Sequence, residues 1–149
     1  MKMNDPRLAQ ILDHYGREHQ RWKLIEECGE LLAEFGRFRN GDLVNRADLI
    51  HECADVYIVT KQLWPVEASK SIEPPFDSVL TVVSAVNELV REAIAGMFGR
   101  NKERELQSAK FVLNHILWLM SSIGELDRFR AAVEFKIARQ VERIEREAR

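Results

Sequence analysis

The chain has 149 residues, which is long enough for one compact domain and short for two. Charged residues make up 31% and hydrophobic residues 46%, and these ordinary fractions exclude a disordered tail. Because 22 Lys and Arg stand against 24 Asp and Glu, the net charge is −2, and we expect no nucleic-acid binding that relies on bulk charge.

Localisation follows from a few missing signals. No apolar run approaches the ~18 residues that a membrane span needs, so no membrane partner is expected. Residues 1–7 are polar and lack the apolar core of a signal peptide. The two cysteines, Cys28 and Cys53, cannot form a disulfide framework. We therefore expect a cytoplasmic protein in which both cysteines are buried free thiols.

The first helical segment is predicted over residues 5–38. Asp5 offers an N-cap oxygen, and Pro6 suits the first helical position. Asn40-Gly41 is a typical helix end. This segment therefore has clear signals at both of its ends.

The later segments are separated by glycine and proline. A second segment, residues 43–64, stops at Pro65, and residues 65–75 hold three of the four prolines and predict a loop. Three more segments are predicted, and their ranges are 76–97, 102–123 and 126 to the end. Apolar residues recur at i, i+3 and i+4 throughout, with no strand-like alternation. The sequence predicts an all-α bundle of about five helices in a single domain covering residues 1–149.

Two helical hairpins show a faint similarity to each other, and a C-terminal helix over residues 126–148 follows them. In residues 5–64, Glu30, Leu31 and Glu34 align with Glu88, Leu89 and Glu92 of residues 76–123. Ser84 and Ala85 stand in the second copy where the first has Glu26 and Glu27. The pattern predicts a degenerate tandem repeat, although any two amphipathic hairpins share this much.

Acidic residues gather on one arc of the first hairpin. Glu26, Glu27 and Glu30 lie within about one helical turn of one another, beside the apolar face. Like charges at these spacings repel by a few tenths of a kcal/mol per pair. No basic residue interrupts the sequence between Lys23 and Arg37, which is uncommon for a solvated helix face.

Two further acids interrupt the most apolar segment of the chain. Glu52 and Asp55 lie at i, i+3 within residues 49–64, which are apolar almost all round. An ionised carboxylate buried there costs several kcal/mol unless it has a partner. The partner is either a basic residue of another helix or a cation shared with Glu27 and Glu30. Spacing favours the cation, and an all-oxygen site suits Mg²⁺ or Mn²⁺ rather than zinc.

The motif Glu26-Glu27-x-x-Glu30 followed by Glu52-x-x-Asp55 resembles the signature of the all-α nucleoside triphosphate pyrophosphohydrolases. These are the MazG-like proteins and the related dimeric dUTPases, and the similar region covers residues 14–63. The resemblance implies hydrolysis of a (d)NTP between its α- and β-phosphates, which yields the nucleoside monophosphate and pyrophosphate. It also implies one or more Mg²⁺ ions bound by the acids.

The family roles are carried over position by position. The resemblance makes Glu27, Glu30, Glu52 and Asp55 the metal ligands. Glu26 would hold a second ion or orient the attacking water, so Glu26 and Glu27 are the catalytic candidates. A carboxylate close to the bound ions would accept a proton from that water.

Contacts to the nucleotide are expected from seven residues: Gln20, Trp22, Lys23, Lys61, Lys136, Arg139 and Arg143. In the family, a basic residue of a late helix commonly contacts the phosphates. Each candidate also has a plainer interpretation. The three cations of the last helix would then form a solvated face, Lys61 a surface lysine and Trp22 a core or interface residue.

The sequence also leads us to expect a homo-oligomer, and it leaves one alternative to an enzyme open. The apolar surfaces of residues 49–64 and 111–123 favour a homo-oligomer, a dimer rather than a tetramer. The alternative to an enzyme is a non-catalytic helical interaction or nucleotide-binding module. In that module the acids form salt bridges between helices, with Arg21, Arg37, Arg39 or Lys61 as partners.

Overall fold

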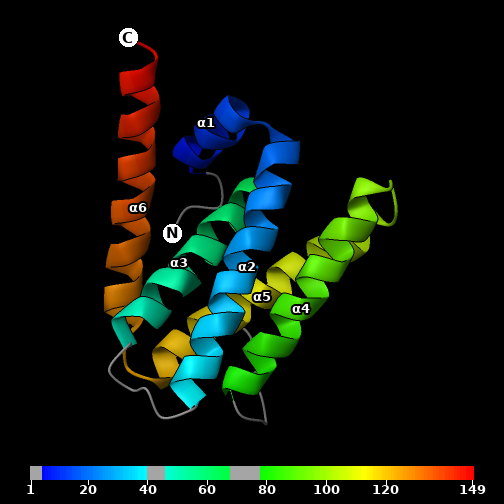
Figure 1. Cartoon of the computed structure of the whole chain (residues 1–149), viewed down its shortest axis with the longest axis vertical. Coiled ribbons are helices and arrows are strands. Elements are labelled where there is room, and N and C mark those ends of the chain that lie inside the picture. The colour runs from blue at the N-terminus through cyan, green and yellow to red at the C-terminus, as the bar shows by residue number, and fades with distance from the viewer. Residues whose placement is uncertain (1–4, 40–45, 68–77) are drawn as a thin grey trace.

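The computed structural model of the chain describes residues 5–39, 46–67 and 78–149. These residues form six α-helices and contain no strand, which confirms the predicted all-α bundle. In chain order the helices are α1 (Pro6–Tyr15), α2 (Arg17–Arg39), α3 (Arg46–Leu63), α4 (Ser78–Met97), α5 (Lys102–Ser122) and α6 (Leu126–Glu147). Figure 1 shows α2 and α3 in the middle of the bundle, with α6 on one side and α4 on the other.

The first predicted segment is two helices rather than one. Asp5 caps α1 as expected, since its side chain accepts a hydrogen bond of 3.0 Å from the backbone N–H of Arg7. The chain then breaks at Gly16, whose φ of 90° is unfavourable for any residue with a side chain. The Gly16 N–H donates to the carbonyl of Leu12 and so ends α1. This break raises the number of helices from the expected five or so to six.

The other predicted breaks lie near the observed ones. Gly99 and Gly124 follow the ends of α4 and α5, with φ values of 75° and 73°. In the second segment α3 covers Arg46–Leu63 and so ends one residue before the expected Trp64, whereas residues 43–45 lie outside the described residues. The Asn40-Gly41 end and residues 68–75 of the predicted loop lie outside the described residues.

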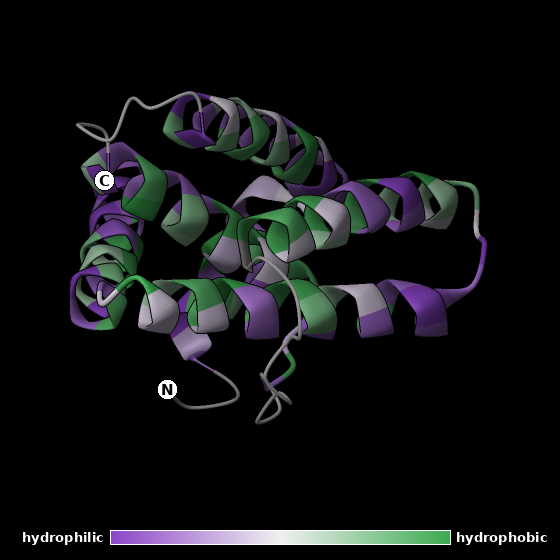
Figure 2. Cartoon of the chain, turned by 90° about the horizontal axis from the view of Figure 1, so that it is seen from below, coloured by the Kyte–Doolittle hydropathy of each residue, from purple (hydrophilic) through white to green (hydrophobic). Residues whose placement is uncertain are grey.

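The helices pack in pairs around one core. α2 packs against α3, α4 against α5 and α6 against α3, while α1 contacts α2, α3 and α6. Buried apolar side chains from all six helices belong to a single hydrophobic cluster. Hydrophilic and hydrophobic stretches alternate along the helices in Figure 2. The first predicted hairpin thus contains the packed pair α2 and α3 together with α1, and the second contains the packed pair α4 and α5. Their origin as a repeat stays a prediction.

Two smaller expectations concern the membrane and the thiols. Among the described residues, no helix combines the length and the apolar character that a membrane crossing requires. Cys28 and Cys53 are both free and buried, as predicted. Burial raises the pKa of the Cys28 thiol to about 12, so it stays protonated near neutral pH.

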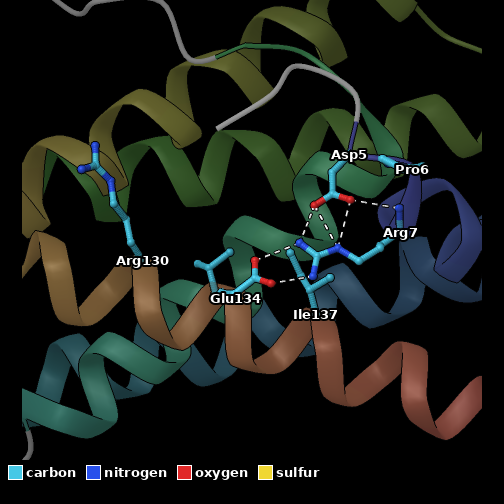
Figure 3. Close-up of a pocket in the computed structure, with 7 residues that line it drawn as sticks. Asp5, Pro6, Arg7, Arg130, Glu134 and Ile137 are labelled. Carbon is cyan, nitrogen blue, oxygen red and sulfur yellow. Dashed lines mark hydrogen bonds and ion pairs between the residues drawn. The ribbon is translucent and has the colours of Figure 1, made fainter.

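An ion-pair bridge fixes α1 to α6. The guanidinium of Arg7 contacts Asp5 at 2.8 Å and Glu134 of α6 at 2.6 Å. Figure 3 shows this guanidinium between the two carboxylates. These bonds raise the pKa of Arg7 further above its ordinary value.

A second ion pair is buried between α2 and α5. Arg21 Nη1 lies 2.6 Å from a carboxylate oxygen of Glu105, whose exposed fraction is 2%. The same guanidinium nitrogen donates to the carbonyl of Ala93 in α4 at 3.0 Å. Gly96 of α4 lies so close to the Glu105 carboxylate that an added Cβ would overlap it. One cation thus links three helices, and the fit depends on a glycine.

Substituting Gly96 by Ala is expected to destabilise the protein by about 1–3 kcal/mol, because the new methyl group would displace the Glu105 carboxylate. This sign is opposite to the usual gain of about 1 kcal/mol for Ala over Gly within a helix. Gly36→Ala is the matched control, because no described atom of a neighbouring group lies within 4 Å of its added Cβ. Urea unfolding measures both. If both substitutions change the free energy of unfolding in the same direction, the predicted overlap with Glu105 is wrong.

Candidate active site

Three acids from two helices meet at one place. Glu27 of α2 and Glu52 and Asp55 of α3 each offer a carboxylate oxygen, and these oxygens lie within 4.8 Å of one another. Glu27 is buried, with an exposed fraction of 7%, and the other two are partly buried. The i, i+3 spacing on α3 sets Glu52 and Asp55 on the side that faces α2. The structure thus brings together three of the four predicted metal ligands.

The fourth predicted ligand and the second catalytic candidate lie at the rim. Glu30 is exposed, and it is close enough to Glu52 for its charge to raise the pKa of that carboxyl. Glu26 is also exposed, with 56% of its side chain accessible, and it contacts Lys23 at 3.3 Å. All five acids therefore belong to one neighbourhood that becomes more buried from Glu26 towards Glu27.

The acids disfavour ionisation in one another. Burial and the charge of Asp55 raise the pKa of Glu27 to about 7. Burial, followed by the charges of Glu30 and Asp55, raises the pKa of Glu52 to about 7. The Oε2 atoms of Glu27 and Glu52 are buried and accept no hydrogen bond from any described residue. A divalent cation would satisfy both orphaned oxygens and offset the repulsion, so this donor set fits Mg²⁺ or Mn²⁺.

Two lysines partly neutralise the acids. Lys23 Nζ lies 3.2 Å from Glu27, and Lys136 Nζ of α6 lies 2.9 Å from Asp55. The Lys136–Asp55 contact joins two helices, as the non-catalytic module requires. Its cation is Lys136, however, and not one of the four partners expected from the sequence. Arg21 pairs with Glu105 instead, and Arg37 pairs with Glu34. No described cation forms an ion pair with Glu52 within 4 Å.

A cavity of about 200 Å³ opens beside the acids, between α2, α3 and α6. Glu27 and Asp55 form its acidic wall. Four of the seven predicted nucleotide-binding residues line the rest of it, and they are Lys23, Lys136, Arg139 and Arg143. The cavity therefore has acidic and basic walls that face each other, and Ile58 and Val59 add an apolar patch.

The structure does not bring the other three predicted nucleotide contacts to this cavity. Gln20 is buried and donates its side-chain N–H to Gln62 at 2.5 Å. Trp22 is exposed, with 60% of its surface accessible. Lys61 lines a different cavity near α1. None of the three lines the cavity beside the acids.

Sequence reasoning missed Gln140. Its side chain lines the cavity, and its Oε1 is buried without a hydrogen bond from any described residue. A signal was present, since Gln140 lies four residues after Lys136 and three before Arg143 on one face of α6. Its amide is a neutral group among the basic residues of that wall.

A larger cavity, of about 440 Å³, lies between α1 and α6 around Arg7. Figure 3 shows Asp5 and Glu134 on either side of the Arg7 guanidinium, with Arg130 apart from them. The acid cavity is smaller, but it has orphaned buried oxygens and raised carboxylate pKa values, which are typical of functional sites.

Comparisons with protein-family models, with curated proteins and with solved structures found no match to this chain. The likeness to the pyrophosphohydrolases therefore rests on the sequence of residues 14–63, with its acid motif at residues 26–55, alone. The geometry of the cavity is an independent argument about its chemistry.

Proposed function

We propose that this protein is a Mg²⁺-dependent nucleoside triphosphate pyrophosphohydrolase, which hydrolyses a (d)NTP to the monophosphate and pyrophosphate. The observation that carries this proposal is the cluster of Glu27, Glu52 and Asp55, in which two carboxylate oxygens are orphaned. The cluster lies beside one small cavity that also has a basic wall. The motif that resembles the pyrophosphohydrolase signature supplies the same acids. The product pattern comes from the resemblance, whereas the need for a cation comes from the geometry.

The acids would hold the cation. Glu27, Glu52 and Asp55 lie close enough to share one ion, and we assign Glu30 at the rim as a further oxygen ligand, since its charge already acts on Glu52. Mg²⁺, or Mn²⁺ in its place, would neutralise phosphate charge and lower the pKa of a bound water. Glu26 lies at the rim, where we assign it to a second ion or to orienting the attacking water.

The last helix would hold the phosphates. Lys136, Arg139 and Arg143 present their charges to the same cavity from one side of α6. Charge-assisted hydrogen bonds from these groups would bind phosphate oxygens and stabilise charge on the departing pyrophosphate. Arg139 and Arg143 offer planar forks that suit bidentate contacts, whereas Lys136 offers a compact charge.

Product analysis tests the reaction. The protein is incubated with each canonical and modified (d)NTP and Mg²⁺, and the products are resolved by chromatography, with a parallel reaction in chelator. Monophosphate with pyrophosphate supports the proposal. Diphosphate with orthophosphate, or the absence of turnover with every nucleotide, contradicts it.

A homo-oligomer, a dimer rather than a tetramer, is part of the same proposal. The apolar surface of α3 is buried inside the chain, so it offers nothing to a second subunit. Exposed apolar side chains support the proposal instead, notably Phe98 directly after α4 and Phe111 on α5, with 79% and 49% of their surfaces accessible. Sedimentation equilibrium measures the mass directly.

The Lys136–Asp55 and Lys23–Glu27 ion pairs favour a second candidate, a non-catalytic helical module whose acids serve only as structural partners. Divalent cations separate the two. At 100 times its Kd, a bound cation adds about 2.7 kcal/mol, or a Tm rise of roughly 5–10 °C for a chain of this size. An unchanged Tm in millimolar Mg²⁺ and Mn²⁺ would favour the structural module.

Cation binding is expected to release protons at pH 6 and almost none at pH 8.5. At pH 6 a large share of Glu27 and Glu52 is protonated, since both pKa values are raised to about 7, and the cation requires both carboxylates ionised. Calorimetry in two buffers of different protonation enthalpy measures the release. Equal binding heats in both buffers at pH 6 would contradict it.

The same groups set how the metal-free protein responds to pH. A carboxyl whose folded pKa lies above its unfolded value stabilises the protein while it is protonated. That contribution falls as the pH rises from about 4.5 to about 7. Glu52→Gln should flatten this fall and raise the metal-free Tm at pH 8 by roughly 2–4 °C, about 1 kcal/mol, because water screens the partly exposed group. A lower Tm in the variant would contradict this account.

A further inference from the structure

Another cavity, with mostly apolar walls, lies at the opposite end of α3 from its acids, and its volume is about 370 Å³. It opens between α1 and the last turn of α3, and it shares no described lining residue with the acid cavity. Leu8, Leu12 and Pro65 give it apolar walls. Such a volume, with apolar walls and a few polar groups, is typical of a small-molecule site.

Lys61 is the first unusual group in this cavity. Its exposed fraction is 3%, yet its ammonium forms no ion pair or hydrogen bond with any described residue. Its Nζ lies over the Tyr57 ring in a cation–π contact, 5.8 Å from the ring centroid. Burial lowers the pKa of Lys61. Lysines are almost never this buried without a paired charge, and the contact of Lys61 among the described residues is the Tyr57 ring, so an anion would add the missing opposite charge.

Gln62 is the second unusual group. Its exposed fraction is also 3%, and its Oε1 accepts a hydrogen bond from Gln20. Its Nε2 is buried and donates to no described residue. Two neighbouring donors, one of them charged, therefore lack acceptors at the wall of one cavity.

The surrounding charges leave the cavity positive. Arg17 adds a second cation, held in place by a hydrogen bond of 2.7 Å from its Nη2 to the carbonyl of Leu63. Asp5 also lines the cavity, but Arg7 contacts both of its carboxylate oxygens, as Figure 3 shows. Glu67 influences Lys61 through its charge and forms no ion pair with it.

We propose that this cavity binds a small organic carboxylate with an apolar body. The carboxylate has two oxygens, which match the two donors that lack acceptors, Lys61 Nζ and Gln62 Nε2. Its single charge offsets Lys61, whereas the nearby Asp5 carboxylate disfavours a phosphate dianion. The apolar body packs against Leu8 and Leu12. This site is independent of the nucleotide chemistry proposed for the acid cavity.

Hexanoate is a suitable probe, with hexanamide as its neutral match and inorganic phosphate as an anion without an apolar body. Binding is followed by NMR titration of the backbone amides of α1 and α3. We expect hexanoate to bind wild type at least tenfold more tightly than hexanamide or phosphate. Lys61→Met should weaken hexanoate binding at least tenfold, whereas Lys110→Met, at an exposed lysine of α5, should leave it unchanged.

A labelling experiment on the wild-type chain needs no variant to fold. Acetic anhydride at neutral pH acetylates lysines, and peptide mapping gives a rate for each one. Hexanoate should slow the acetylation of Lys61 several-fold and leave that of Lys110 unchanged. The proposal is overturned if hexanoate does not bind, if hexanamide or phosphate binds as well, if Lys61→Met binds as wild type does, or if Lys61 is not protected.

Discussion

Replacing Glu27 by Gln is expected to lower kcat/KM for (d)NTP hydrolysis by at least about 100-fold, the usual cost of losing one essential electrostatic group. Glu27 is the most buried of the three clustered acids, and one of its oxygens has no partner among the described residues. An amide keeps the shape of the side chain but loses the charge that would bind the cation. Initial rates of pyrophosphate release measure the effect.

Glu88→Gln is the control for this variant. Glu88 is an exposed glutamate of α4 at the position that aligns with Glu30, so its loss should leave the rate within twofold of wild type. Without metal, the Tm of Glu27→Gln at pH 8 should also be no lower than that of wild type. The pKa of Glu27 is raised to about 7, so at pH 8 the folded wild type carries an unfavourable negative charge that the variant lacks. If Glu27→Gln hydrolyses (d)NTP as fast as wild type, Glu27 has no role in the mechanism.

Arg21→Ala is expected to lower the free energy of unfolding by about 3–5 kcal/mol, because it leaves a buried carboxylate without its counter-ion. Glu105 is 2% exposed, and Arg21 is its only ion-pair partner among the described residues. The substitution also removes the hydrogen bond to the carbonyl of Ala93. Urea denaturation, with m-values compared between the proteins, measures the loss.

Two further variants separate burial from charge. Arg146→Ala removes an ion pair of 2.7 Å on the surface of α6 and should cost no more than about 1 kcal/mol. The double variant Arg21→Met with Glu105→Met should recover most of the loss, because apolar side chains often replace a buried ion pair without cost. If Arg21→Ala and Arg146→Ala lower the free energy of unfolding equally, burial of the Arg21–Glu105 pair does not increase the cost of breaking it.

Helix boundaries were predictable where a local signal marks them. Asp5-Pro6 begins α1, and Gly99 and Gly124 follow α4 and α5, because capping and positive φ depend on neighbouring residues alone. Gly16 carries the same signal and was overlooked, because apolar residues keep their helical spacing on both sides of it. A glycine inside a periodic segment therefore counts as a candidate break.

The acid cluster was predictable for a similar reason, whereas its partners were not. Spacing along one helix places Glu52 and Asp55 on one face, but the meeting of Asp55 with Lys136 depends on how α6 packs on α3. For Lys61, by contrast, the spacing along α3 already argues against a place in the acid cavity. Six positions after Asp55 correspond to about 240° of rotation, so helix geometry alone already places the two on different faces.

The ion pair between Lys136 and Asp55 has a consequence for the order in which ligands bind. Each group is already the partner of the other, at 2.9 Å. A cation that arrives alone must compete with the ammonium for Asp55, and a polyphosphate that arrives alone must compete with the carboxylate for Lys136. A cation and a polyphosphate that bind together give both groups new partners at once. Under the proposed function, thermodynamic linkage then makes each ligand raise the affinity for the other by the same factor.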